Sequence, residues 1–114
     1  MIAVIFEALP ATGKWNEYLE LAAGLRPALD QIEGFISIER FQSISNPEKV
    51  LSLSFWKDEN SITQWRNIEM HRVAQQKGRN TIFDNYRIRI AQVDRDYGLT
   101  DRAQAPNDSK LIHQ

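Results

Sequence analysis

Two residues able to take part in chemistry lie close together in the sequence, Trp65 and His71. His71 is one of only two histidines in the chain. An imidazole can transfer a proton near neutral pH, ligate a metal or haem iron, or simply face water. The surrounding segment has the apolar spacing of a helix, so these three roles depend on how that helix is oriented.

The sequence offers few metal ligands. It contains no cysteine, which excludes disulfides, thiolate sites and cysteine nucleophiles. Glu69 and His71 are two residues apart and would point about 200° from each other on a helix, so they cannot share an ion. The five glycines are scattered and form no phosphate-binding loop. We therefore expect no metal site and no bound cofactor.

Arginines in two predicted strands are the remaining charged candidates. Arg40 alternates with isoleucines in "FISIERFQS", which directs it toward an interior or an interface, and Glu7 is a candidate partner. In the last strand, Arg87, Arg89 and Arg95 could hold an anion, but cross-strand ion pairs are the commoner arrangement. Serines in "VLSLSFWK" are interpreted as polar alternation rather than nucleophiles.

Composition limits the classes of protein to consider. The 114 residues fit one domain, with 42% hydrophobic residues and a formal net charge of -1. This balance favours neither nucleic acid nor an anionic membrane as a partner. The beginning, "MIAVIFEALPATGKW", lacks the basic segment of a signal peptide and is too short to span a bilayer. We expect a cytoplasmic protein.

The elements that must position the candidates alternate between strand and helix. Strands are predicted at about 1–9, 35–43, 50–57 and 85–95, with helices at about 13–30 and 58–78. This is the ferredoxin-like βαββαβ order, an α+β fold with a four-stranded antiparallel sheet. Residues 1–98 would form this domain, and 99–114 a polar, flexible tail.

Details of these elements are also predicted. Thr12 is the expected cap of the first helix, Pro27 is expected to kink or end it, and Asp58 or Ser61 is expected to cap the second helix. Two strands carry apolar residues on both faces, although the fold covers only one face with helices. A second copy could cover the other face, which predicts a homodimer.

The phase of the second helix decides the role of His71. In one unbroken helix, the inward stripe contains Ile62 and Trp65, and His71 lies about 120° from Trp65. If the helix bends at Asn67, which is a credible N-cap, His71 could turn inward. The sequence leaves both arrangements open.

Several stretches together resemble the antibiotic biosynthesis monooxygenase (ABM) family over about residues 1–98: "LSLSFWKDENSITQW", "HRVAQQKGR" and "YRIRIAQVDRDYG". The resemblance implies a dimeric α+β barrel with a pocket between sheet and helices. It also implies cofactor-independent oxidation of an aromatic, quinol-type small molecule by dioxygen. The implied catalytic residues are His71 and Trp65, and the implied substrate-binding residues are Phe6, Arg40, Phe55, Trp56 and Tyr86.

Two alternatives remain. A haem-degrading branch of the same family uses a strand-one asparagine, a tryptophan on the second helix and a histidine ten residues later. Trp65 matches that tryptophan, but Gln75 occupies the histidine position and the first strand contains no asparagine. The other alternative is a non-catalytic small-molecule-binding or stress-response module, because a fold alone does not fix an activity.

Overall fold

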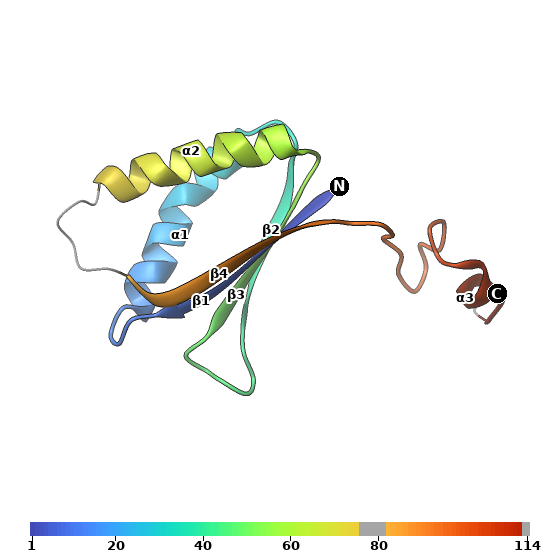
Figure 1. Cartoon of the computed structure of the whole chain (residues 1–114), viewed down its shortest axis with the longest axis horizontal. Helices are drawn as coiled ribbons and strands as arrows, with labels where there is room; N and C mark the ends of the chain where they lie inside the picture. Colours follow the sequence, from blue (N-terminus) through green and yellow to red (C-terminus); the bar gives the residue numbers. More distant parts are fainter. Residues whose placement is uncertain (76–81, 113–114) are drawn as a thin grey trace.

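The computed structural model describes the backbone of residues 1–75 and 82–112 and the side chains of 1–68 and 82–110. Its elements, in chain order, are β1 (Ile2–Pro10), α1 (Trp15–Asp30), β2 (Phe35–Gln42), β3 (Val50–Trp56), α2 (Glu59–Gln75), β4 (Phe83–Gln92) and α3 (Asn107–Ile112). The four strands form one antiparallel sheet in the order β2-β3-β1-β4. The predicted ferredoxin-like fold is confirmed (Figure 1).

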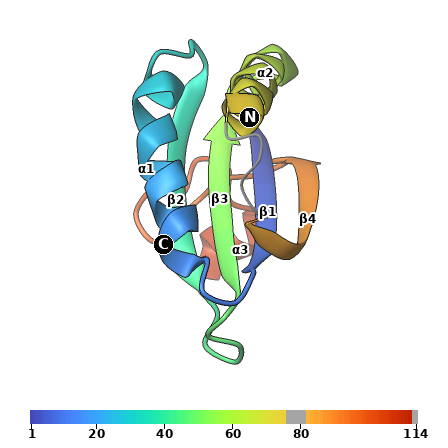
Figure 2. The ribbon, with the colours of Figure 1, turned by 90° about the vertical axis from the view of Figure 1, so that its left-hand side faces the viewer.

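Both long helices lie on the same side of the sheet, as Figure 2 shows with α1 and α2 in front of the strands. Because successive side chains of a strand point to opposite faces, each strand divides its residues between the two faces. We call the face under α1 and α2 the helix face and the opposite one the open face.

Helix α1 begins later than predicted and does not stop at its proline. Its N-cap is Lys14, with no side-chain cap hydrogen bond, so the predicted Thr12 cap is wrong. Gly13, with φ of +78°, makes the turn that separates Thr12 from the helix. The helix continues through Pro27 to Asp30. Leu25 and Leu29 are buried on either side of Pro27, and this packing holds the last turns in place.

Helix α2 begins at the predicted cap. The Asp58 carboxylate accepts hydrogen bonds from the Ser61 amide (2.9 Å) and the Ser61 hydroxyl (2.8 Å), which confirms Asp58 as the N-cap. The helix is a single element through Asn67, so the predicted alternative of two short helices is wrong. Trp65 and Ile68 both pack against the same core cluster, and this shared contact keeps the two turns in phase.

The core of the helix face is built around Trp56, which is completely buried. Its ring packs against Phe35 (centroids 5.2 Å apart) and Trp65 (6.4 Å). Its indole N–H donates to the Ser54 hydroxyl at 2.8 Å, so burial leaves no polar atom of the ring without a partner. A second cluster, of Ala8, Tyr18 and Val50, forms at the other end of the sheet.

An irregularity in β2 changes the face of one aromatic residue. Strict alternation places Phe35 on the same face as Phe41. The register shifts between Phe35 and Ser37, and Phe35 pairs with Trp56 on the helix face. Ile36, at the shift, is 53% exposed. A bulge therefore moves Phe35 into the core, against the alternation.

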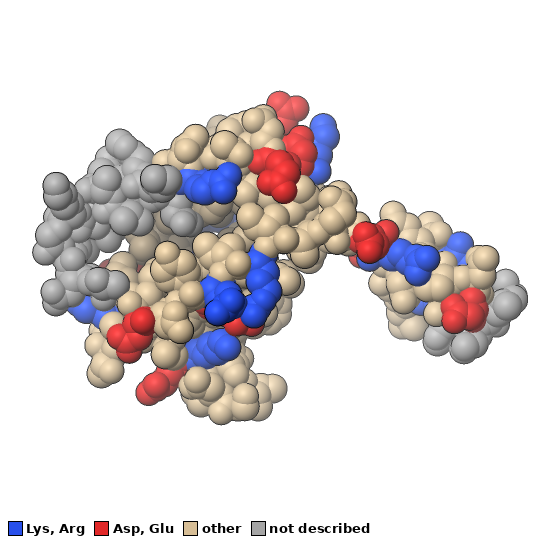
Figure 3. Space-filling model, in the orientation of Figure 1, with Lys and Arg blue, Asp and Glu red and all other residues tan. Residues whose placement is uncertain are grey.

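After β4, the chain leaves the domain as an arm that we define as residues 93–112. It projects on the open-face side of the sheet (Figures 1 and 2) and forms a separate lobe in Figure 3. The radius of gyration is 16.9 Å, against about 13 Å for a compact chain of this length. Within the arm, the Arg102 guanidinium lies over the Tyr97 ring and donates to the carbonyls of Gly98 and Ser109. Part of the predicted polar tail is thus a short folded unit.

In the part of the chain that the structure describes, no helix has the length and apolar character needed to cross a membrane.

Candidate active site

A cavity of about 190 Å³ lies between the helix face and the two long helices. Its lining is mainly apolar, with three hydroxyl groups and the guanidinium groups of two arginines. The lining residues are Val4, Phe6, Tyr18, Leu21, Ala22, Leu25, Ile38, Arg40, Ser52, Ser54, Ile62, Trp65, Arg66, Phe83, Ile88 and Ile90.

The strands supply the floor of the cavity as two neighbouring rows across the sheet. Paired residues of an antiparallel ladder share a face. The register therefore aligns one side chain from each strand, in the order β2, β3, β1, β4. The first row is Arg40, Ser52, Phe6 and Ile88, and the second is Ile38, Ser54, Val4 and Ile90.

The helices supply the walls through residues at helical spacing. Residues of α1 at positions 18, 21, 22 and 25 occupy one stripe, and residues of α2 at 62, 65 and 66 face them across the sheet. Trp65 is half-buried, while Arg66 is exposed at the rim. The walls supplied by the two helices are therefore mainly apolar, with one exposed cation among them.

Arg40 and Tyr18 form the main polar contact of the cavity. The Arg40 Nε donates to the Tyr18 hydroxyl at 3.2 Å, and the guanidinium carbon lies 6.0 Å from the centre of the Tyr18 ring. Tyr18 is buried and Arg40 is half-buried. Ser52, opposite Arg40 in the ladder, is also buried. Three hydrogen-bond donors thus gather in one corner of a mostly apolar space.

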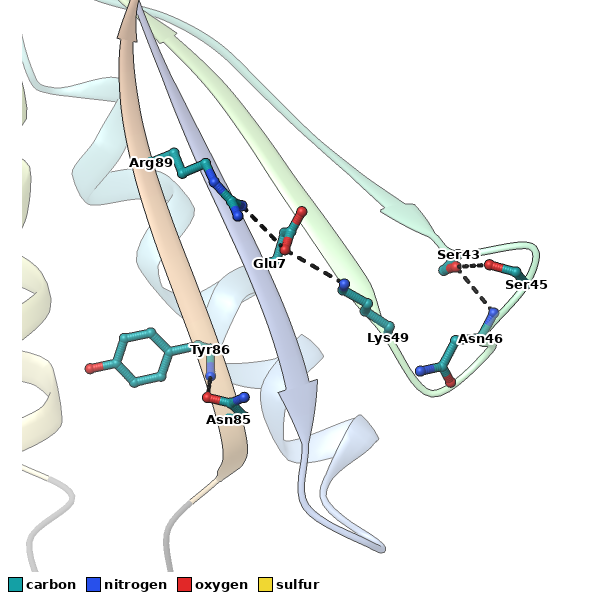
Figure 4. A network of polar contacts seen from close by, with 8 residues as sticks. All are labelled: Glu7, Ser43, Ser45, Asn46, Lys49, Asn85, Tyr86 and Arg89. Atoms are coloured by element: carbon teal, nitrogen blue, oxygen red, sulfur yellow. Dashed lines mark hydrogen bonds and ion pairs between the residues drawn. The ribbon is translucent and has the colours of Figure 1, made fainter.

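Glu7 is not the partner of Arg40, so that prediction is wrong. Glu7 lies opposite Leu51 in the ladder and points to the open face, while Arg40 points to the helix face. There Glu7 pairs with Lys49 (3.5 Å) and Arg89 (3.4 Å), as Figure 4 shows. The charge of Lys49 and the hydrogen bond from Arg89 hold the pKa of Glu7 below its ordinary value. Strand β3 lies between β1, which carries Glu7, and β2, which carries Arg40, and the pleat directs the two side chains to opposite faces of the sheet.

The predicted site residues fall into three groups. Phe6, Arg40 and Trp65 line the cavity. Trp56 lies in the core beside Trp65, and Tyr86 is 57% exposed while its ring contacts Phe6 (centroids 5.6 Å apart).

The third group of predicted site residues is Phe55 and His71. Phe55 pairs with Ala3 and faces the open side, so the structure does not bring it to the cavity. His71 lies on α2, and an unbroken helix places its position about 120° around the axis from Trp65. The His71 side chain itself lies outside the described residues.

Tyr18 and Ser52 belong to the cavity but were not singled out from the sequence. Tyr18 falls on the inward stripe of α1, a pattern that indicates burial but does not distinguish a cavity from solid core. Ser52 follows the alternation of its strand, which also does not distinguish a cavity from a solid core. The sequence feature that could have identified Ser52 as a cavity residue is that Ser52 and Ser54 are polar residues on a face otherwise predicted to be covered.

The described residues of this cavity offer haem no axial ligand. An axial ligand would have to face it, and no imidazole lies among the described lining residues. The Tyr18 hydroxyl already accepts a hydrogen bond from Arg40. Among the described residues, no group of three acidic or histidine side chains could hold a metal ion. We derive no step that passes through either group.

Comparisons with known proteins agree with this fold. The family model described as "Antibiotic biosynthesis monooxygenase" matches residues 1–77. The "Jasmonate monooxygenase ABM" of Pyricularia oryzae is 46% identical over 93 residues, which are 82% of this chain but 43% of that protein. The chain thus spans less than half the length of this relative.

Solved structures share the architecture. One assigned to the antibiotic biosynthesis monooxygenases, from Deinococcus radiodurans, superposes with a TM-score of 0.70 at 12% identity, covering 86% of this chain and 97% of the other. The heme-degrader MhuD of Mycobacterium tuberculosis, with two hemes bound, gives a TM-score of 0.64 at 17% identity, covering 86% and 100%. At such identities the likeness establishes the fold alone.

Proposed function

Because the chain belongs to the antibiotic biosynthesis monooxygenase family, we propose that it is a monooxygenase that oxidises a small, electron-rich molecule of the aromatic or quinol type with dioxygen. The observation that carries this proposal is the mainly apolar cavity with a few convergent polar groups, the usual character of a small-molecule site. The cavity volume of about 190 Å³ is below the ~300 Å³ typical of drug-sized ligands, which favours a small substrate.

The proposed reaction needs no bound flavin, haem or metal, since the substrate itself supplies the electrons. An activated ring CH₂ loses a proton, and the resulting carbanion passes electrons to dioxygen and forms a C–O bond. Loss of water from the peroxide then leaves a carbonyl. The sum is R₂CH₂ + O₂ → R₂C=O + H₂O, in which one oxygen atom enters the product and the other is reduced to water.

The protein contributes binding, exclusion of water and proton transfer. Phe6 and Trp65 offer aromatic surfaces to a flat substrate, and the buried lining residues Ala22, Leu25 and Ile62 limit the access of water to the carbanion. The Tyr18 hydroxyl accepts a hydrogen bond from Arg40 and can donate its own proton in a hydrogen bond to a polar group of the bound molecule. His71 is the proposed residue for proton transfer, and Trp65 its proposed companion on α2.

The name of the Pyricularia relative adds jasmonate as a substrate to test. Jasmonate is a small, largely apolar molecule, which suits the lining of the cavity. It lacks an activated aromatic ring, so the source of the electrons for its oxygenation would differ from that in the quinol reaction. We keep it as a ligand for comparison.

A homodimer is part of this proposal. The open face presents a continuous apolar surface of half-buried or exposed side chains from three strands: Ile5, Leu51, Leu53, Phe55 and Phe41. An apolar surface of this kind marks an interaction site. The arm projects on the same side of the sheet, where it could contact a second copy (Figure 2). A stable monomer at micromolar concentration in sedimentation velocity would contradict this assembly.

The test of the activity is oxygen uptake with a panel of anthrones, naphthols and quinols, together with identification of the carbonyl product. Ala22→Leu places a larger side chain into the cavity and is expected to reduce kcat/KM at least tenfold. Ala23→Leu is the matched control, because Ala23 is the neighbouring alanine on the exposed side of α1. It should leave the rate unchanged.

Uptake no faster than the uncatalysed rate across the whole panel would overturn the monooxygenase proposal and favour a binding module. Equal losses in both alanine variants would show that the cavity is not the site of reaction.

A further inference from the structure

Arg40 faces a mostly apolar cavity in which the described residues supply no acid to neutralise it. Among the described residues, it forms no ion pair, and the Tyr18 hydroxyl is the group to which it donates a hydrogen bond. Placing a cation against apolar surface is costly unless a partner compensates it. The arrangement is explained if the compensating charge arrives with a ligand.

Among the described residues, the ionised side chains that line the cavity are Arg40 and Arg66, and both are cations. The acidic residues of the adjacent strands point elsewhere, since Glu39 pairs with Leu53 and Glu7 with Leu51 on the open face. The cavity therefore favours an anion over a neutral or cationic group.

The donors near Arg40 match a carboxylate in number and position. Nε is engaged by Tyr18, which leaves the two terminal nitrogens with four N–H groups. Ser52 lies directly opposite Arg40 in the ladder, so its hydroxyl is at the distance of a paired neighbour. The Tyr18 hydroxyl accepts from Arg40 and keeps its own proton to donate. A planar carboxylate can accept from all three side chains.

We propose that Arg40, with Tyr18 and Ser52, binds the carboxylate of a small apolar acid whose body lies against Phe6 and the apolar walls of the cavity. This inference rests on the proposed function and narrows it, because it assigns the substrate an acid group remote from the oxidised carbon. Arg40 is then a specificity-determining residue that fixes the orientation of the substrate.

The experiment compares two probes that differ in charge and little else, 1-naphthylacetate and 1-naphthylacetamide, by isothermal titration calorimetry. The wild-type protein is expected to bind the acid at least tenfold more tightly than the amide. Arg40→Met keeps an unbranched apolar side chain and removes the charge, and it should abolish this preference by weakening the acid at least tenfold. The amide should change by less than threefold.

Arg87→Met is the matched control. It removes an equal charge from the same sheet, but Arg87 points to the open face opposite Glu7. It should keep the preference for the acid. A melting curve for each variant verifies that it folds.

Equal affinity for acid and amide in the wild-type protein, no binding of either probe at millimolar concentration, or an unchanged preference in Arg40→Met would each overturn the carboxylate site. Calorimetry requires no turnover, so this result is independent of the oxygenase test. Acid binding through Arg40 without oxygen uptake would refute the proposed reaction alone. Oxygen uptake with neutral quinols, combined with equal calorimetric affinity for the acid and the amide, would refute the carboxylate site alone.

Discussion

The arginines on the two faces of the sheet have different partners. On the open face, Arg89 and Lys49 share the carboxylate of Glu7 (Figure 4). On the helix face, Arg40 contacts a tyrosine hydroxyl and, within the described residues, no carboxylate. An exposed cation is hydrated whether or not it is paired, so its pairing contributes little. A half-buried cation beside apolar walls has lost part of that hydration, and the proposed carboxylate ligand would compensate it.

The faces also differ in how they are filled. Helices seal the helix face around Trp56 and leave a cavity beside it, whereas the open face keeps an apolar surface that a second copy could cover. Under the proposed function, a strand with apolar residues on both sides serves two purposes: one side forms the core and the cavity, and the other forms the proposed dimer interface.

The largest expected effect separates adjacent residues of β3. Trp56→Ala removes a fully buried ring from the helix face and should lower the free energy of unfolding by about 3–5 kcal/mol. Phe55→Ala, on the open face, should cost the isolated chain less and instead weaken the dimer. Urea denaturation and sedimentation velocity measure the two quantities. Equal losses of stability without a change in association would contradict the division into two faces.

A smaller effect is expected where β2 approaches α2. Gly34 has φ of +95°, and a Cβ there would clash with the Ser61 hydroxyl. Gly34→Ala should therefore destabilise the protein by about 1–3 kcal/mol in urea denaturation. Gly24→Ala is the control, because Gly24 lies inside α1 with open space around it. It should stabilise by roughly 0.5–1 kcal/mol, and a loss at Gly24 would show that α1 needs its glycine for another reason.

The smallest effect concerns the charges of the open face. The lowered pKa of Glu7, caused first by Lys49, means that its ionised form is favoured by folding. Its contribution is present above the ordinary carboxyl pKa and is lost as the pH falls through the lower, folded-state value. Glu7→Gln should therefore flatten the decline of melting temperature in acid, more so at low salt.

Asp58 provides the comparison on the side of the helices. Hydrogen bonds from Ser61 lower its pKa, and these are less sensitive to salt than the ion pairs of Glu7. Asp58→Asn should also flatten the acid decline, but to a similar degree at low and high salt. Equal salt sensitivity of the two variants would contradict the distinction.

Much of the fold could be predicted from the sequence, because local patterns carry it. Strand alternation, helical spacing and the Asp58 cap are relations between residues that are near each other in the chain. They gave the order of elements, the face of Phe6 and the inward stripe that contains Trp65. Arg40 was recognised as a cation directed toward an interior for the same reason.

What the sequence alone determined, then, is which side chains share a face within each element. Only the tertiary structure decided which faces meet. The bulge at Phe35, the passage of α1 through Pro27 and the contact between Arg40 and Tyr18 all depend on packing between elements distant in sequence. The partner expected for Arg40 was wrong because the pleat sends Glu7 to the other face. The alternation of residues along one strand predicts which side chains share a face. The register between strands and the docking of the helices determine which of those side chains line the cavity.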